Sequence, residues 1–296
     1  MNDVSDGVAA RFASAAEVAA RLTAAGYLPN TAIASVVHLA DRLAKPILVE
    51  GPAGTGKTEL AKCIAAVTGS RLLRLQCYEG LDETKALYEW DYRKQLLHIQ
   101  ASTSLRNEDS VEKVEADLFA ERFLLERPLL AAIRSPEPVV LLIDEVDRLD
   151  VETEALLLEV LSDYQVSIPE LGTVTATSTP LVVLTSNNSR DLSEALKRRC
   201  LFLHLGYPTA EREREIVRSR VPDLEERVAT KMTELIQSLR RLNLKKRPSV
   251  SETIDWARTL VLLGAQEIDG ELLTQSLPIL LKYQSDVELA AAELAS

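Results

Sequence analysis

Apolar residues along the chain gather in short continuous runs that alternate with stretches of helical spacing. Turn residues bound each run, and the stretches between runs repeat apolar positions every three or four residues. This alternation predicts an α/β fold with a mostly parallel, buried five-stranded sheet that has helices on both faces. The five predicted strands are Ile47–Glu50, Leu72–Cys77, Val139–Ile143, Leu181–Thr185 and Leu201–Leu205.

The pattern changes on either side of this region. Helical spacing without strands covers Ser14–Ala25 and Thr31–Leu43, and only helical patterns follow Gly206-Tyr207-Pro208. We therefore expect N-terminal helices packed on the core over residues 1–45, an α/β domain over 46–206, and a small all-helical domain over 207–296. Between the second and third runs, Ser102–Glu115 is polar and strongly charged, so we expect an exposed excursion there.

A glycine-rich segment joins the first predicted strand to a predicted helix. It reads Gly51, Pro52, Ala53, Gly54, Thr55, Gly56, Lys57 and Thr58, and Glu59 follows it. The glycines let backbone N–H groups converge on phosphate oxygens, while the lysine reaches the β- and γ-phosphates and the threonine hydroxyl can hold Mg²⁺. The strand predicted before this segment and the helix predicted after it are the context in which a phosphate-binding loop occurs. Average residue usage produces such a pattern by chance in about a percent of chains or fewer.

Two carboxylates, Asp144 and Glu145, stand at the end of the apolar run Val139–Ile143. Ligands of open parallel sheets lie at the carboxyl ends of the strands. An acidic pair at a strand end is by itself often only a solvated loop, but the upstream phosphate loop favours a functional pair. Asp144 is then expected to bind Mg²⁺ through water, and Glu145 to orient the water that attacks ATP.

These two motifs, together with Thr185-Ser186-Asn187 and Leu196-Lys197-Arg198-Arg199, resemble the ordered motifs of AAA+ ATPases over most of residues 30–265. The resemblance implies a P-loop AAA+ core followed by a helical lid, with ATP and Mg²⁺ as ligands. It makes Asn187 the sensor 1 residue near the γ-phosphate. It also makes Arg199, with Arg198 as a close second, an arginine finger that reaches a neighbouring subunit, although a basic pair at a helix end can also serve the helix dipole alone.

Longer strings narrow the resemblance to MoxR-type ATPases, and within them to the CoxD-like group. The strings are Gln76-Cys77-Tyr78-Glu79-Gly80-Leu81-Asp82, Ala86-Leu87-Tyr88-Glu89-Trp90, Arg127-Pro128-Leu129-Leu130 and Arg247-Pro248-Ser249-Val250-Ser251-Glu252. One departure is that no arginine stands at Ser249–Ser251, where MoxR sequences tend to place the sensor 2 residue. Arg247 is the nearest substitute and Arg258 is another.

The MoxR resemblance implies a molecular chaperone that forms a homo-oligomer, expected to be a hexameric ring. Its hydrolysis cycle remodels a client protein, such as a metal-containing enzyme, and relatives often act beside a von Willebrand A-domain partner. An insert at about 88–120 and a β-hairpin at about 166–176 are then expected to face the pore. Trp90, Tyr92 and Leu96 would give the insert an apolar contact surface, although core packing explains the aromatic residues equally well.

Two alternative functions are a DNA-associated motor and a P-loop kinase. The net charge of −11 argues against extensive contacts with a nucleic-acid backbone, and Val166–Ser178 contains no Lys or Arg. A DNA-associated motor is therefore the weaker interpretation. A P-loop kinase is weaker still, because it leaves Asn187 and Arg199 without a purpose.

The length of the apolar runs and the cysteine content indicate where in the cell the protein is expected. No apolar run approaches the ~20 residues of a membrane span, so we expect a cytoplasmic protein without a membrane span. Three scattered cysteines in apolar surroundings are typical of reduced thiols in a protein core, and with only three histidines a structural zinc site is not expected.

Overall fold

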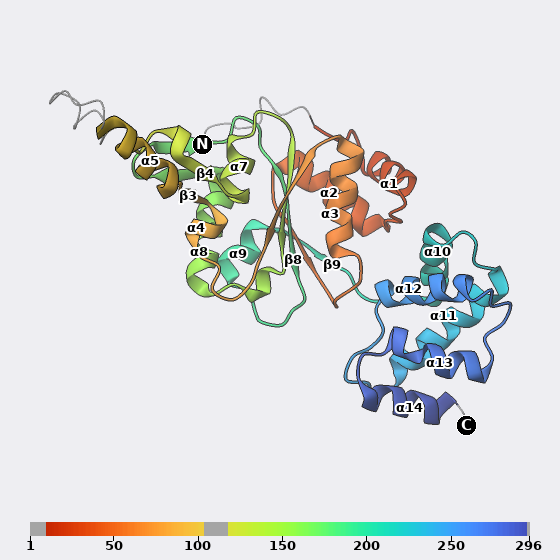
Figure 1. The fold of residues 1–296 in the computed structure, drawn as a ribbon. Helices are drawn as coiled ribbons and strands as arrows, with labels where there is room; N and C mark the ends of the chain where they lie inside the picture. Colours follow the sequence, from red (N-terminus) through yellow and green to blue (C-terminus); the bar gives the residue numbers. More distant parts are fainter. Residues whose placement is uncertain (1–9, 104–117, 295–296) are drawn as a thin grey trace.

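The computed structural model describes residues 10–103 and 118–294, and its centre is a five-stranded parallel sheet (Figure 1). The order across the sheet is β2-β5-β8-β1-β9, and every neighbouring pair is parallel. The strands are β1 (Ile47–Glu50), β2 (Arg71–Gln76), β5 (Val139–Asp144), β8 (Leu181–Ser186) and β9 (Leu201–His204). The predicted strands are confirmed, with ends that differ by one residue at most.

Both faces of this sheet are buried, because consecutive side chains of each strand point to opposite sides. On β5, Val140 and Leu142 join one apolar cluster, while Leu141 and Ile143 join the other. The helices that cover the first face are α1 (Ala15–Ala24), α2 (Thr31–Leu43) and α3 (Lys57–Thr68). The sheet is thus the middle of three layers.

The second face is covered by helices and by two small antiparallel sheets (Figure 1). The helical segments that cover it are α4 (Glu83–Ala86), η2 (Glu121–Phe123), α7 (Pro128–Arg134), η3 (Val146–Arg148), α8 (Val151–Asp163) and α9 (Glu194–Arg199), while α5 (Tyr92–Thr103) lies on the same side and contacts η2. The small sheets pair β3 (Tyr88–Trp90) with β4 (Leu124–Glu126) and β6 (Gln165–Ile168) with β7 (Gly172–Thr175). The second pair is the expected β-hairpin, whereas most of the expected excursion at Ser102–Glu115 lies outside the described residues.

In the described residues after β9, all regular elements are helices, which lie together beside the α/β part (Figure 1). They are α10 (Ala210–Arg220), α11 (Glu226–Arg241), α12 (Val250–Leu262), α13 (Gly270–Leu280) and α14 (Gln284–Leu294). These helices enclose an apolar cluster of their own around the fully buried Trp256. The predicted α/β core with a following helical lid is confirmed.

Short polar side chains fix where many of these helices begin. Ser14, Asn30, Asp150 and Thr209 each accept a hydrogen bond from a backbone N–H in the first turn of the helix that follows. Such caps satisfy donors that would otherwise lack a partner inside the helix. The helix starts are therefore encoded locally, one by one.

None of the helices in residues 10–103 and 118–294 is both long enough and apolar enough to cross a membrane. Within the same residues, Cys63 and Cys77 are buried, Cys200 is half-buried, and all three are free thiols. Burial raises the pKa of the Cys77 and Cys200 thiols to about 12. Both side chains therefore remain protonated near neutral pH, as expected of thiols in a protein core.

Candidate functional site

The three central strands bring the predicted site residues to one edge of the sheet. Strands β5, β8 and β1 are direct neighbours in parallel register, so the segments after Ile143, Ser186 and Glu50 emerge side by side. Carboxyl ends of parallel strands are where open α/β sheets bind ligands. The phosphate loop, the acidic pair and Asn187 therefore meet at one place. Lys57 and Asn187, for example, are 130 residues apart in the chain.

The phosphate loop has a backbone that only glycine adopts easily. Gly54 has φ +73° and Gly56 has φ +93°, directly before α3 begins at Lys57. A Cβ atom at Gly54 would overlap the side chain of Ser249. The loop thus directs its backbone and the amino end of α3 toward one point, which is the arrangement that binds phosphate.

Lys57 lies across this point with its ammonium group held by three oxygen atoms. Nζ donates to the carbonyls of Gly51 and Pro52, both at 2.7 Å, and to Oδ1 of Asn187 at 2.9 Å. Burial lowers the pKa of Lys57, and the carboxylates of Asp147, Asp144 and Glu145 oppose that shift. A desolvated ammonium among polar groups interacts strongly with a phosphate charge.

Asp144 is buried, with 3% of its surface exposed, and two hydroxyl groups donate to its carboxylate. Thr58 Oγ1 lies 3.0 Å from Oδ1, and Thr185 Oγ1 lies 2.5 Å from the same atom. The Arg74 guanidinium completes the set at 2.6 Å from Oδ2. A carboxylate beside a threonine hydroxyl is the hard oxygen donor set that Mg²⁺ prefers, so these residues fit the predicted ion.

Glu145 has an unusual backbone, with φ +59° and ψ +49° in the left-handed region. Non-glycine residues there cost about 1–3 kcal/mol and cluster at functional sites. Its N–H donates to Thr185 Oγ1 at 2.9 Å. Its Oε2 accepts a hydrogen bond from Gln76 Nε2 and forms an ion pair with Arg148 Nε, both at 3.1 Å. The structure thus sets this carboxylate at the edge of the site and holds it from two sides.

Arg198 and Arg199 lie far from these groups within one chain. Helix α9 ends directly before β9, whose first residue Leu201 pairs with Ile47, the first residue of β1. The phosphate loop begins after the last residue of β1, so about 13 Å of strand separates the two ends. Arg199 donates to Ser162 Oγ at 2.6 Å and to the Ala195 carbonyl, whereas the side chain of Arg198 has no hydrogen bond or ion pair among the described residues.

The helical lid contacts the phosphate loop through the start of α12. Ser251 N–H donates to the Gly54 carbonyl at 3.3 Å, and Ser249 forms a capping box with Glu252 directly beside it. A second bridge joins Arg220 of α10 to Glu59 of α3 at 2.8 Å. The residues at the loop are therefore serines, while Arg247 is exposed and its side chain makes no hydrogen bond or ion pair within the described part of the chain.

The side chains that β2 contributes to the site were not predicted from the sequence. Arg74 and Gln76 stand on the carboxyl half of β2, which pairs with β5 so that Gln76 lies opposite Asp144. A polar residue at the end of a predicted strand was a usable signal for Gln76. Arg74 gave no such signal, because its role depends on the neighbouring strand.

The expected contact surface of the insert needs a correction at Trp90. This side chain is only 7% exposed and packs edge-on against Tyr88 and Phe119, inside the apolar cluster beneath the sheet. Tyr92 and Leu96 are 62% and 59% exposed. Strand β3 turns Trp90 inward, whereas α5 carries the other two on its outer side.

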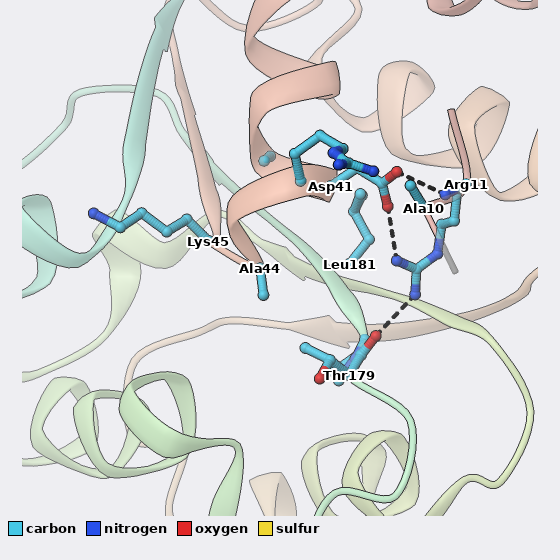
Figure 2. Close-up of a pocket in the computed structure, with 10 residues that line it drawn as sticks. Ala10, Arg11, Asp41, Ala44, Lys45, Thr179 and Leu181 are labelled. Atoms are coloured by element: carbon cyan, nitrogen blue, oxygen red, sulfur yellow. Dashed lines mark hydrogen bonds and ion pairs between the residues drawn. The ribbon is translucent and has the colours of Figure 1, made fainter. Parts of the chain in front are cut away.

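A cavity of about 170 Å³ lies at the opposite end of the sheet, where β8 begins (Figure 2). The Arg11 guanidinium faces the Asp41 carboxylate at 2.9 Å and the Thr179 carbonyl at 2.8 Å, while Lys45 points away from them. The backbone N–H groups of Arg11 and Phe12 also donate to Asp41. The charged groups pair with each other here, and the contacts attach the N-terminal segment to α2 and to Thr179, just before β8.

The fold and the site together define a class. A phosphate loop after β1, an acidic pair after β5 and a polar residue after β8, on a sheet ordered β2-β5-β8-β1-β9 with a helical lid, are the features of P-loop AAA+ proteins. Residues 46–200, slightly more than half of the chain, match the family described as AAA domain (dynein-related subfamily). The chain belongs to this family of nucleotide-binding AAA+ proteins.

Individual relatives are distant in sequence. An uncharacterized protein of Staphylococcus haemolyticus is 24% identical over 226 residues, which covers 74% of this chain and 76% of that protein. An uncharacterized protein of Staphylococcus aureus is 25% identical over the same shares. Among solved structures, a point mutant of Thermotoga maritima RuvB is 18% identical with a TM-score of 0.49, over 90% of this chain and 71% of that one. Similarity at that level says nothing about what this protein acts on.

Proposed function

We propose that this protein hydrolyses ATP and uses the energy to remodel a client protein as a MoxR-type ring. The observation that carries the ATPase part is the meeting of Lys57, Asp144 and Asn187 at the ends of three adjacent strands. AAA-family membership of residues 46–200 supports it. The ring and the client rest on the resemblance of the longer sequence strings and on the position of the arginines.

Each residue has a defined task in this proposal. The loop from Gly51 to Thr58, with Glu59 behind it, binds the phosphates, and Lys57 moves from the Gly51 and Pro52 carbonyls to the β- and γ-phosphate oxygens. Thr58 and Asp144 hold Mg²⁺, which supplies charge compensation for the phosphates when bound. Glu145 accepts a proton from the attacking water and orients it.

Asn187 helps to place the attacking water. Its Oδ1 already lies 2.9 Å from Lys57 Nζ, so it can follow the ammonium group as this group turns to the γ-phosphate. In the lid, the start of α12 at Ser249 and Ser251 lies at the loop. Arg247, two residues before Ser249, is our candidate for the arginine that the lid contributes.

The proposed ring follows from where the arginines lie. Arg198 and Arg199 are at the other end of the sheet from their own phosphate loop, so neither can serve the phosphates of its own chain. In this proposal a second copy provides the arginine, which makes hydrolysis depend on assembly. We therefore propose a homo-oligomer, a hexamer by family resemblance, in which Arg198 or Arg199 acts on the neighbouring site.

A protein client is supported by two surfaces. Tyr92 and Leu96 present an exposed apolar strip on α5, which suits contact with a protein chain. The hairpin of β6 and β7 has no basic residue, which is unfavourable for a DNA backbone. We propose a protein client, such as a metal-containing enzyme, and a von Willebrand A-domain protein as a further partner.

Mixed assemblies test both hydrolysis and action in trans. Lys57→Ala removes the ammonium group and should abolish ATP binding, while Arg199→Ala should bind ATP but lose about 10³–10⁵ in rate. Mixed at equal amounts, the two variants should recover part of the phosphate release, because a Lys57→Ala subunit lends its arginine to an Arg199→Ala site. The same mixture made with Arg198→Ala shows which arginine is used.

Three outcomes would contradict the proposal. Unchanged ATP affinity of Lys57→Ala would refute the phosphate loop, and absence of recovery despite demonstrated subunit exchange would refute action in trans. Strong stimulation of ATP turnover by DNA, with no client retained by a Glu145→Gln trap, would favour a DNA motor instead.

A further inference from the structure

A buried carboxylate outside the predicted site ties the acidic-pair segment to the loop after β8. Asp147 lies in η3, three residues beyond Asp144, and is 4% exposed. Its Oδ1 accepts the N–H of Asn187 at 3.2 Å. Its Oδ2 accepts both the N–H of Ser189 at 2.9 Å and the hydroxyl of Ser189 at 2.5 Å.

These contacts hold the loop on both sides of a tight bend. Asn188, between the two anchored residues, has φ +59° in the left-handed region. Asparagine tolerates this conformation better than most residues, but it is still uncommon and needs support from its surroundings. A single carboxylate that receives the N–H groups before and after Asn188 supplies that support.

The bend decides where the side chain of Asn187 points. With its N–H held by Asp147, Asn187 places Oδ1 at 2.9 Å from Lys57 Nζ. Asp147 and Lys57 also interact at longer range, since Asp147 is the foremost of the charges that oppose the burial-driven fall of the Lys57 pKa.

The carboxylate can keep this role at neutral pH. Burial alone would raise the pKa of Asp147, but the hydrogen bonds from Ser189 and from the Asn187 N–H outweigh it and bring the pKa below its usual value. An ionised carboxylate accepts all three hydrogen bonds at once, whereas an amide would turn a donor toward one of the N–H groups.

We propose that Asp147 is a positioning residue for ATP hydrolysis: it fixes the bend at Asn188 and so aims Asn187 at Lys57 and the γ-phosphate. The inference rests on the proposed ATPase function and adds a residue to it. A displacement of about 1 Å in such a group can cost about 100-fold in rate. Binding of ATP depends mainly on the phosphate loop, so it should change little.

A double-mutant cycle tests whether Asp147 acts through Asn187. Asp147→Asn and Asn187→Ala should each retain ATP affinity within about 3-fold and lower kcat by at least about 10-fold. Because both changes disturb the same group, the double variant should be hardly slower than the slower single variant. Additive losses of kcat would overturn the inference, as would a normal kcat for Asp147→Asn.

Asp41→Asn is a matched control for loss of stability. Asp41 is also buried and also accepts two backbone N–H groups, from Arg11 and Phe12, but it lies at the opposite end of the sheet. It should lower the melting temperature about as much as Asp147→Asn while kcat stays within about 2-fold. An equal loss of kcat in this control would reduce the role of Asp147 to general stability and overturn the inference.

Two further results complete the test. If Asp147→Asn does not fold, Asp147→Glu keeps the charge and displaces the carboxylate by one methylene, and it should also lower kcat with ATP affinity retained; a normal kcat there overturns the inference. If the wild-type protein binds ATP without turnover, the proposed function fails and this inference fails with it. Turnover in the wild-type with a normal rate in both Asp147 variants refutes the inference alone.

Discussion

At the scale of single residues, the site combines strain with dense hydrogen bonding. Glu145 occupies a left-handed backbone conformation directly after a buried strand, and its N–H is bound by Thr185. Its neighbour Asp144 is bound by the same hydroxyl group. A shared hydroxyl of this kind fixes the Asp144 carboxylate relative to the Glu145 backbone, so small changes at Thr185 should reach both residues.

Glu145→Gln should leave ATP bound with near-normal affinity, because the amide has the same shape and Asp144 and Thr58 are untouched. It should lower phosphate release by about 10²–10⁴-fold, the usual contribution of a general base. Nucleotide titration and steady-state phosphate release measure the two quantities.

An exposed carboxylate close by serves as the control for Glu145→Gln. Glu152 lies in the first turn of α8 and is exposed, so Glu152→Gln removes one charge from the same region without touching the site. Its turnover should match the wild-type. A Glu145→Gln protein with near-normal phosphate release would remove Glu145 from the mechanism.

At the scale of elements, the segment between β2 and β5 has an inner and an outer side. Strand β3 places Trp90 in the core beside Phe119, while α5 carries Tyr92 and Leu96 outward. The outer residues are on one side of a helix because they are four positions apart. Only the outer side is available to the client that we propose.

Trp90→Ala should lower the free energy of unfolding by about 3–5 kcal/mol, because it leaves a large cavity in the core. Tyr92→Ala should change it by less than about 0.5 kcal/mol and leave ATP turnover intact. Urea unfolding followed by circular dichroism compares them, and a Tyr92→Ala loss as large as that of Trp90→Ala would refute the outward placement.

At the scale of the whole molecule, two bodies with separate apolar cores meet at the phosphate loop. A buried ion pair joins helices of the lid. Arg240 donates to both carboxylate oxygens of Glu213, at 2.6 and 2.7 Å, and to the Pro248 carbonyl. Thr253 also donates to Glu213 at 2.7 Å. The pair therefore connects α10, α11 and α12, the last of which contacts Gly54.

Arg240→Ala leaves the Glu213 carboxylate buried without its counter-charge, which should destabilise the lid by about 3–5 kcal/mol. Hydrogen exchange should show loss of protection in α10, α11 and α12, while the strands of the central sheet keep theirs. The exposed i,i+3 pair of Arg258 and Asp255 supplies the control, since Arg258→Ala should leave the exchange pattern unchanged. Equal loss of protection in lid and sheet would show that the two bodies unfold together.

Most of the fold could be predicted from local sequence patterns. The five apolar runs became the five sheet strands within one residue, because a strand buried on both faces leaves a continuous apolar signal that needs no distant information. The helix starts at Ser14, Asn30 and Thr209 were equally local, since each cap bonds a backbone group three residues away. The phosphate loop and the acidic pair were recognisable because their residues are adjacent in the chain.

Tertiary structure alone decided the rest, because it depends on which strands and loops become neighbours. Pairing of β2 with β5 brings Arg74 and Gln76 to the acidic pair, and η3 brings Asp147 to a loop 40 residues away. Trp90 is buried because β3 pairs with β4, which an aromatic residue in an amphipathic stretch does not reveal. Likewise, the parallel register of β1 and β9 places Arg198 and Arg199 at the opposite end of the sheet from Lys57, since strand order and register arise from packing between distant segments.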